Sequence, residues 1–209
     1  MLKVVIFIVS LLLTACGDTA RLSLLSTDAT LLAFGDSLTS GVGVPVQQSY
    51  PAVLAQLLDL KVINAGKVGE VTADGKDRLV ALLKENVPDL VLICHGGNDF
   101  LHRLPLAETE KNLREMVYQA QSLGIEVVLI GVPEPGIWGK APDLYRRVAR
   151  EFNVPLDDEM LGKLETDSSM KSDPVHFNKQ GYQKLAEQVA ALLARSGAVA
   201  LVSGVAADN

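Results

Sequence analysis

The stretch LLAFGDSLT, residues 31–39, decides the fold that the sequence predicts. Its apolar residues stop at Gly35-Asp36-Ser37, a pattern typical of a buried strand that ends in a tight turn into a helical segment. In that geometry Ser37 stands above the edge of a sheet. Taken alone, the tripeptide is equally typical of a plain turn with a helix cap, because Gly, Asp and Ser favour both.

A second stretch, SDPVHFN at residues 172–178, favours a chemical role for this serine. A serine hydroxyl is a weak nucleophile until a neighbouring base accepts its proton, so a catalytic Ser37 needs a histidine within reach. His176 lies in this stretch, with Asp173 three residues before it. Each of the two is, by itself, also typical of a turn or of a surface position.

Short apolar runs alternate with helix-like stretches along the rest of the chain. Strands are expected at residues 31–34, 61–65, 89–94, 126–130 and 154–156, and helices at 48–58, 72–85, 106–123, 143–152 and 179–195. This alternation predicts a parallel sheet with helices on both faces. The expected fold is a three-layer α/β/α sandwich with a flavodoxin-like central parallel sheet of about five strands. Ligands of such sheets bind at the carboxyl ends of the strands, and Ser37, Gly69 and Asn98 each follow a strand.

The length and composition favour one globular domain. The chain has 209 residues, of which 48% are hydrophobic and 21% charged, enough to bury a core. Its net charge of -6 argues against nucleic-acid binding, which relies on clustered Lys and Arg. The three histidines lack the spacing of a metal site, and we predict neither a metal nor a cofactor. His95, beside the expected site, is interpreted as a structural or pocket-wall residue.

The first 15 residues have the pattern of a signal peptide. Lys3 precedes an apolar run at residues 4–13 that is too short to span a bilayer comfortably. The run ends in Leu13-Thr14-Ala15-Cys16, which resembles the bacterial lipobox; a plain secretory signal with a coincidental cysteine is the alternative. We therefore expect an exported bacterial lipoprotein of the periplasm or cell envelope, anchored to a membrane through a lipid on Cys16.

The mature chain is expected to have three parts. A tether occupies residues 16–29, the folded domain residues 30–196, and a loosely ordered tail residues 197–209. The second cysteine, Cys94, lies within the apolar run at residues 90–94 and is interpreted as a small buried residue rather than a catalytic one.

Four motifs together resemble those of the GDSL, or SGNH, hydrolase family. In chain order they are Gly35-Asp36-Ser37-Leu38, residues 64–69 ending in Gly69, Gly96-Gly97-Asn98-Asp99, and Asp173-Pro174-Val175-His176. Each motif is weak alone, but the four follow one another in order along essentially the whole domain. The resemblance is greatest to the bacterial thioesterase, lysophospholipase and arylesterase subgroup. The chain departs from it in the second motif, which reads Lys67-Val68-Gly69-Glu70-Val71 where that subgroup more often has Ser-Gly-Asp-Thr. This bears on hydrogen bonding in the loop and on substrate choice but keeps the glycine donor.

The resemblance implies a serine esterase that forms an acyl-enzyme on Ser37. His176 would take the proton of Ser37 and Asp173 would orient the imidazole. The backbone N–H groups of Ser37 and Gly69 and the side-chain amide of Asn98 would form the oxyanion hole. The implied substrates are lysophospholipids, arylesters or acyl-thioesters, without a cofactor.

Acyl specificity is expected to depend on the loops around Leu101 and around Ile137 and Trp138, which would form an apolar wall, although Trp138 is equally consistent with core packing. Two other functions remain open. One is a carbohydrate O-acetyl esterase of the cell envelope, although one Trp and 5% aromatic residues leave few rings to stack on sugars. The other is a non-catalytic lipid-binding lipoprotein, because a fold does not by itself fix a function.

Overall fold

The computed structural model describes residues 20–136 and 139–200, which form a five-stranded parallel sheet with helices on both faces. The order of the strands in the sheet is β2-β1-β3-β4-β5. Their bounds are β1 Thr30–Gly35, β2 Lys61–Gly66, β3 Leu90–Cys94, β4 Glu126–Ile130 and β5 Leu156–Asp157. This is the flavodoxin-like order. The predicted fold class is therefore confirmed.

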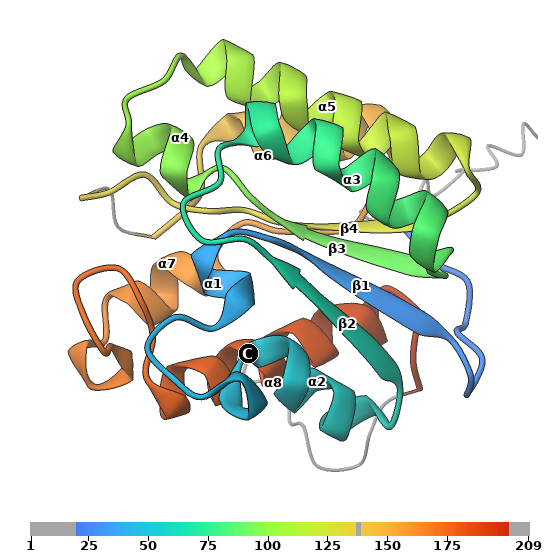
Figure 1. Ribbon diagram of the computed structural model, residues 1–209, viewed down its shortest axis with the longest axis horizontal. Coiled ribbons are helices and arrows are strands. Elements are labelled where there is room, and N and C mark those ends of the chain that lie inside the picture. The colour runs from blue at the N-terminus through green and yellow to red at the C-terminus, as the bar shows by residue number, and fades with distance from the viewer. Residues whose placement is uncertain (1–19, 137–138, 201–209) are drawn as a thin grey trace, which may run out of the picture.

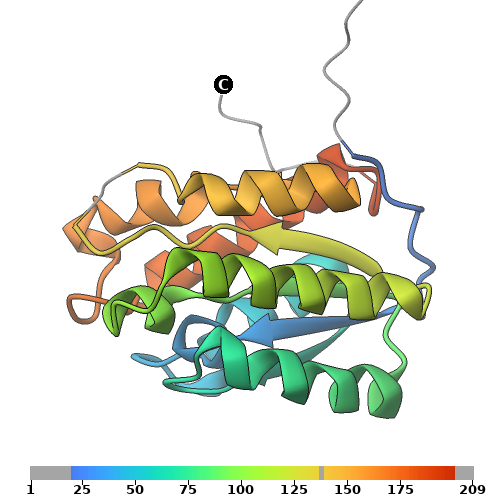
Figure 2. The same ribbon diagram turned by 90° about the horizontal axis from the view of Figure 1, so that it is seen from above.

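The helices form the two outer layers of the sandwich (Figure 1). On one face of the sheet lie α3 (Thr72–Asn86), α5 (Leu106–Ser122) and α6 (Asp143–Phe152), which run side by side in Figure 2. On the other face lie α2 (Tyr50–Leu58) and α8 (Lys179–Arg195), together with the short helices α1 (Ser37–Ser40) and α7 (Met160–Glu165). Two 3-10 turns, η1 (Val46–Gln48) and η2 (Ser168–Met170), and the five-residue helix α4 (Gly97–Leu101) lie in the connections.

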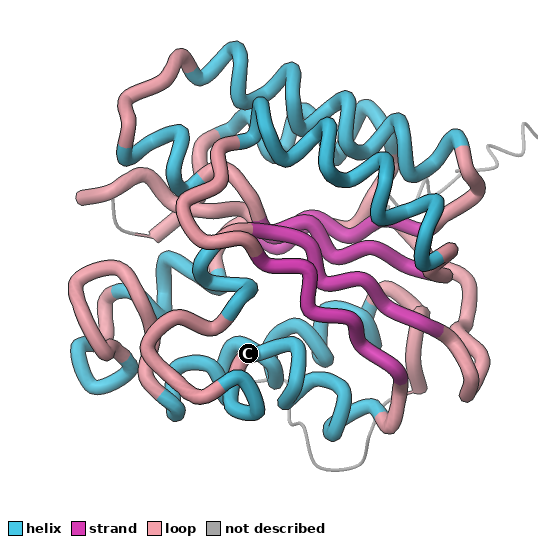
Figure 3. The backbone as a smooth tube through the Cα atoms, viewed as in Figure 1, coloured by secondary structure: helices cyan, strands magenta, loops and turns pink. Residues whose placement is uncertain are grey.

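The central strands β1 and β3 are almost entirely apolar because both of their faces are covered. Every residue of β3 is buried, and β1 is buried from Leu31 onward. Since β1 pairs with β2 on one side and with β3 on the other, its last residue, Gly35, lies between Gly66 and Cys94 at the carboxyl edge. The loops that leave this edge lie together at the left of the molecule in Figure 3. The motif residues that follow β1, β2 and β3 therefore come together there.

The observed elements differ from the predicted ones where the sequence signal is short. Helices α4 and α7 have 5 and 6 residues and were not predicted, because one or two turns show little periodicity. The fifth strand is Leu156–Asp157 rather than residues 154–156. Pro155 accepts a hydrogen bond from Leu129 N–H but has no N–H to donate, so the regular pairing starts one residue later.

The predicted tether and tail are ordered where the structure describes them. The backbone N–H groups of Leu22 and Leu25 donate to the carbonyls of Ser196 and Ala198, each at 2.8 Å, and Ala198 is fully buried. The folded unit thus extends beyond the predicted limits of 30 and 196 at both ends. The predicted signal peptide, Cys16 and residues 201–209 lie outside the described residues. Within the described ranges, no helix has the length and apolar character needed to cross a membrane.

Candidate active site

Ser37 is the first residue of α1, directly after the central strand β1. The side chain of Asp36 caps this short helix by accepting a hydrogen bond from Leu38 N–H at 3.1 Å. Burial raises the pKa of Asp36, and its charge interaction with His95 and its bond from Leu38 only partly offset this. The turn holds the Ser37 hydroxyl at the carboxyl edge of the sheet, as the sequence predicts.

His176 and Asp173 reach Ser37 from a loop that precedes α8. Nε2 of His176 lies 3.0 Å from Oγ of Ser37, and Nδ1 lies 2.8 Å from Oδ2 of Asp173. A carboxylate only accepts hydrogen bonds, so Nδ1 carries the proton and Nε2 is free to accept from the serine. The loop is closed by Ser172 N–H, which donates to the carbonyl of His176 at 2.9 Å. The three predicted residues therefore form one hydrogen-bonded chain.

The Asp173 carboxylate is held by the loop that it belongs to. Its Oδ1 accepts the backbone N–H groups of Val175 and His176, both at 2.8 Å. Partial burial opposes ionisation, but the bonds from the backbone and ring of His176 and from Val175 outweigh it and lower the pKa of Asp173 to about 2. The carboxylate is thus charged at any pH at which His176 can act as a base.

Asn98 and Gly69 lie on two further loops at the same edge. Nδ2 of Asn98 donates to the carbonyl of Glu70 at 3.0 Å and to Oδ2 of Asp36 at 3.3 Å. Gly69 has a φ of +75°, which favours glycine, and no atom lies within 4 Å of the place where a Cβ would be. Asn98 thereby ties the loop after β3 to the loop after β2 and to the turn after β1.

A cavity of about 130 Å³ opens beside Ser37 and Asn98. Leu101, Val132, Pro133 and Pro135 give it apolar walls, and Leu101 is one of the predicted substrate contacts. The other two, Ile137 and Trp138, lie outside the described residues. The cavity is also lined by two charged side chains that sequence reasoning missed, Glu165 and Lys171. Burial raises the pKa of Glu165 and lowers the pKa of Lys171.

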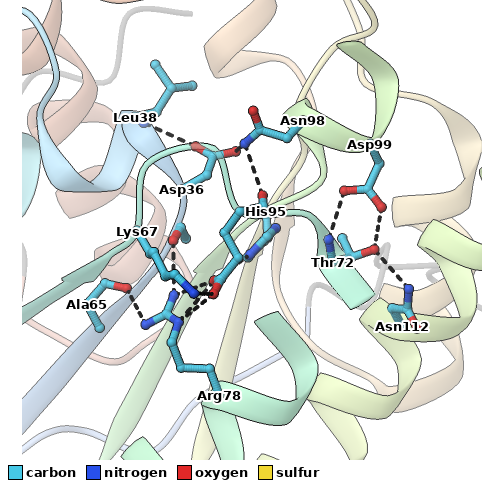
Figure 4. Close-up of polar contacts among 12 residues, drawn as sticks. Asp36, Leu38, Ala65, Lys67, Thr72, Arg78, His95, Asn98, Asp99 and Asn112 are labelled. Carbon is cyan, nitrogen blue, oxygen red and sulfur yellow. Dashed lines mark hydrogen bonds and ion pairs between the residues drawn. The ribbon is translucent and has the colours of Figure 1, made fainter. Parts of the chain in front are cut away.

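Three buried acids near the motif residues were also missed. They are Asp36, Glu70 and Asp99, each directly next to a candidate site residue and each 2–3% exposed. Figure 4 shows Lys67, Arg78 and His95 together on one side of Asn98, and Asp99 with Thr72 and Asn112 on the other. The sequence does carry a signal for them, because an acid stands directly beside the candidate site residue in Asp-Ser, Gly-Glu and Asn-Asp.

The remaining candidates take structural positions. His95 is fully buried beneath the loops, and its Nε2 lies 3.2 Å from Oε2 of Glu70, in accord with the structural interpretation. Cys94 is buried at the end of β3, and burial raises the pKa of its thiol well above the usual range. His102 is exposed after α4. In the part of the chain that the structure describes, no three His, Cys, Asp or Glu side chains are grouped as they would be around a metal ion.

Comparison with known proteins supports the same assignment. The sequence profile of the GDSL-like lipase/acylhydrolase family matches residues 33–184. The chain is 32% identical to esterase TesA of Pseudomonas aeruginosa over 193 residues, which covers 86% of this chain and 95% of TesA. It is 31% identical to thioesterase 1/protease 1/lysophospholipase L1 of Escherichia coli K12 over 169 residues, 77% of this chain and 81% of the other.

A solved structure of TesA covers 80% of this chain and 99% of its own, with a TM-score of 0.72 and 29% identity. The profile match includes all four motifs, from the strand before Ser37 to the start of α8 beyond His176. The chain therefore belongs to the GDSL-like lipase/acylhydrolase family of serine hydrolases.

Proposed function

We propose that this esterase cleaves acyl esters through an acyl-enzyme on Ser37, with His176 as the base and Asp173 as its orienting partner. The observation that carries the proposal is the unbroken chain from Ser37 Oγ to His176 Nε2, at 3.0 Å, and from Nδ1 to Asp173 Oδ2, at 2.8 Å. A nucleophile, a base and an orienting acid in this geometry are what acyl transfer requires.

In the first half of the reaction, His176 removes the proton of Ser37 as Oγ attacks the ester carbonyl. The negative oxygen of the tetrahedral intermediate is stabilised by the N–H groups of Ser37 and Gly69 and by Nδ2 of Asn98. His176 then gives its proton to the departing alcohol or thiol, leaving Ser37 acylated. A water molecule repeats the sequence, with His176 again as base, and releases the acid.

The substrates we propose are lysophospholipids, arylesters and acyl-thioesters. Relatives named arylesterase, from Vibrio mimicus, and thioesterase 1/lysophospholipase L1, from Escherichia coli, are 33% and 31% identical to this chain and support this range. The apolar residues Leu101, Val132 and Pro133 in the cavity wall suit an acyl chain.

The test is a hydrolysis series with the purified protein. It uses p-nitrophenyl esters from acetate to palmitate, one lysophospholipid and one acyl-CoA. Ser37→Ala is the matched control, because it removes only a hydroxyl and leaves the backbone of α1 in place. We expect serine-dependent cleavage that peaks at medium or long acyl chains. Equal hydrolysis by the Ser37→Ala variant would refute the assignment of the nucleophile.

A second candidate function is removal of acetyl groups from envelope polysaccharide. The cavity lining that supports it is polar: Glu165 offers a carboxyl group and Lys171 an ammonium group beside the same opening. Such groups can bind sugar hydroxyls, whereas they are poor neighbours for a long alkyl chain. Cleavage of acetate alone in the ester series, together with release of acetate from an acetylated polysaccharide, would favour this candidate over the first.

We also propose that the protein is a lipoprotein anchored through Cys16. The chain joins the domain at the amino ends of the strands, where Ser23 N–H donates to the side chain of Glu126, the first residue of β4, at 3.0 Å. The seven residues from Cys16 to Leu22 span at most about 20 Å. A lipid on Cys16 would therefore hold the domain with its candidate active site turned away from the anchoring membrane.

Substitution of the cysteine tests the anchor. We expect Cys16→Ser to move the protein from the membrane fraction to the soluble fraction and to abolish incorporation of labelled palmitate, while ester hydrolysis by the purified variant stays unchanged. Palmitate labelling that persists in the variant would show that the lipobox interpretation is wrong.

A further inference from the structure

Glu70 is a buried acid next to the glycine of the candidate oxyanion hole. Its side chain is 0% exposed. Nε of Arg78 lies 2.8 and 3.0 Å from its two carboxylate oxygens, Nε2 of His95 lies 3.2 Å away and Nζ of Lys67 3.3 Å away. Burial by itself opposes ionisation, but the hydrogen bonds from His95 and Arg78 outweigh it and lower the pKa of Glu70 to about 2. Glu70 is therefore a buried carboxylate that stays charged because it is fully paired.

The partners of this carboxylate are fixed to the sheet. Arg78 also donates from Nη1 to the carbonyl of Ala65 at 3.0 Å and from Nη2 to that of Gly35 at 3.3 Å, and its guanidinium lies 4.3 Å from the centre of the Phe34 ring. These contacts are to the carboxyl ends of β1 and β2. The Glu70 carboxylate is thus held by the same two strands that deliver the nucleophile and the glycine loop.

His95 is also held rigidly. The Tyr145 hydroxyl donates to its carbonyl at 2.8 Å. Its ring lies so close to α3 that a Cβ on Gly75 would be 2.5 Å from Nε2, so this position of the helix admits only glycine without a shift of the ring. The imidazole is therefore confined by α3 and by the Phe34 ring, whose centre lies 5.5 Å from its own, and its Nε2 lies 3.2 Å from Glu70.

The main chain of Glu70 connects two of the three candidate oxyanion donors. Its N–H donates to the carbonyl of Lys67 at 3.2 Å and closes the turn in which Gly69 has its positive φ. Its carbonyl accepts Nδ2 of Asn98 at 3.0 Å. The main chain of Glu70 therefore contacts both the Gly69 turn and the Asn98 amide, and the side chain of Glu70 fixes the position of that main chain.

We propose that Glu70 is a positioning residue of the oxyanion hole. Its carboxylate, fixed by Arg78 and His95, sets the position of the Gly69 N–H and of the Asn98 amide before substrate binds. Glu70 touches no reacting atom and acts only through these two groups. The inference rests on the proposed reaction at Ser37.

The test compares Glu70→Gln with the native protein in steady-state hydrolysis of p-nitrophenyl acetate. The substitution keeps the size of the side chain but removes its charge and one acceptor oxygen. Loss of one oxyanion donor costs about 10²–10³ in rate, so displacement of two without removal is expected to lower kcat about 10- to 100-fold. KM is expected to stay within about twofold, because the bound substrate carries no oxyanion, which forms only in the tetrahedral intermediates and the transition states that flank them. Acylation and deacylation both pass through such a state, so kcat falls whichever limits turnover.

Two variants separate positioning from a general loss of structure. Glu110→Gln changes another carboxylate that pairs with an arginine through two oxygens, since Nε of Arg147 lies 3.1 and 3.2 Å from Glu110, but this pair links α5 to α6 away from the cavity. It is expected to leave kcat unchanged. Glu70→Asp keeps the charge and is expected to restore kcat to within about fivefold of the native value.

The proposal is overturned by an unchanged kcat in folded Glu70→Gln, by equal losses in Glu70→Gln and Glu110→Gln, or by a Glu70→Asp variant as slow as Glu70→Gln. If Glu70→Gln does not fold, His95→Leu takes its place, since it removes the 3.2 Å hydrogen bond to Glu70 and keeps an apolar side chain against Phe34. It must show the same fall in kcat without a change in KM, and the absence of that fall also overturns the proposal. A native protein that cleaves no ester would instead refute the proposed function itself.

Discussion

Replacement of Asp173 by asparagine reverses the hydrogen-bond polarity of the catalytic chain. Oδ1 of Asp173 accepts two backbone N–H groups, from Val175 and His176, both at 2.8 Å, while Oδ2 accepts Nδ1 of His176 at 2.8 Å. Asparagine has a single acceptor oxygen, and the two backbone donors hold it at the Oδ1 position. The amide nitrogen then faces Nδ1 and can only donate to it, so the imidazole proton moves to Nε2.

A proton on Nε2 of His176 makes the ring a donor to Ser37, and the ring can no longer accept the serine proton. The loss expected for an imidazole held in the wrong tautomer is about 10⁴ in kcat, which corresponds to about 5.5 kcal/mol of transition-state stabilisation. The fold of the loop should survive, because the two backbone bonds to the oxygen at position 173 are retained. We expect the melting temperature to change by less than about 3 °C.

The assay is hydrolysis of p-nitrophenyl acetate at neutral pH, with a thermal melt of each variant. Asp167→Asn is the matched control: Asp167 accepts the N–H and the hydroxyl of Ser169, at 2.9 and 2.6 Å, in a similar turn of the same region, without a contact to His176. Its kcat should be unchanged. A folded Asp173→Asn variant with more than about a tenth of the native kcat would refute the proposed role of Asp173.

Three further predictions concern the cavity and the buried network. The fold lowers the pKa of Glu70 to about 2, from about 4.3 in an unfolded chain, so its ionic bonds contribute about 3 kcal/mol to the free energy of unfolding above pH 5. This contribution is lost as the pH falls through 4 toward 2. Urea titrations should therefore show Glu70→Gln less stable than the native protein at pH 6 and nearly equal to it near pH 2. Tyr145→Phe removes the buried bond to the carbonyl of His95 and should cost about 1 kcal/mol by the same method, whereas Tyr118→Phe, at a residue 60% exposed, should cost nothing measurable. Leu101→Ala should lower kcat/KM for p-nitrophenyl hexanoate more than for acetate, because it removes part of the apolar cavity wall; an equal loss on both esters would contradict that placement.

The sequence predicts the fold well because the central strands have a clear pattern. Residues 31–34 and 90–94 are continuous apolar runs that end in glycine motifs, which is the pattern of a covered parallel strand. The sequence also predicts that Ser37, Asp173 and His176 come together, since a nucleophilic serine near one end of the chain needs the histidine near the other end as its base. The sequence does not predict the contacts of the buried acids, because their partners belong to no recognisable motif or spacing. Arg78 is one of many charged residues on a helix, and nothing in its spacing relates it to the buried acid in the preceding loop.

The buried acids explain why three of the motifs consist of paired residues. In Asp36-Ser37, Gly69-Glu70 and Asn98-Asp99, one residue of each pair is a candidate site residue and its neighbour is a buried carboxylate. Asp36 accepts from Leu38 N–H and Asn98, and Glu70 from Arg78 and His95. Asp99 accepts the N–H of Thr72, at the start of α3, at 2.9 Å, and the hydroxyl of Thr109 at 3.2 Å.

In each loop a candidate site residue thus stands beside an acid that fixes the loop to the scaffold. An oxyanion hole requires donors that do not reorganise during the reaction, and a loop held only by its own backbone would not supply them. The charge of Glu70 strengthens this fixation, because a charged acceptor makes stronger hydrogen bonds than a neutral one and costs more when left unpaired. Asp36 and Asp99 fix their loops through the hydrogen bonds that they accept. We therefore expect Asp36, Glu70 and Asp99 to serve the geometry of the site, whereas Asp173 belongs to the hydrogen-bonded chain that runs through His176 to Ser37.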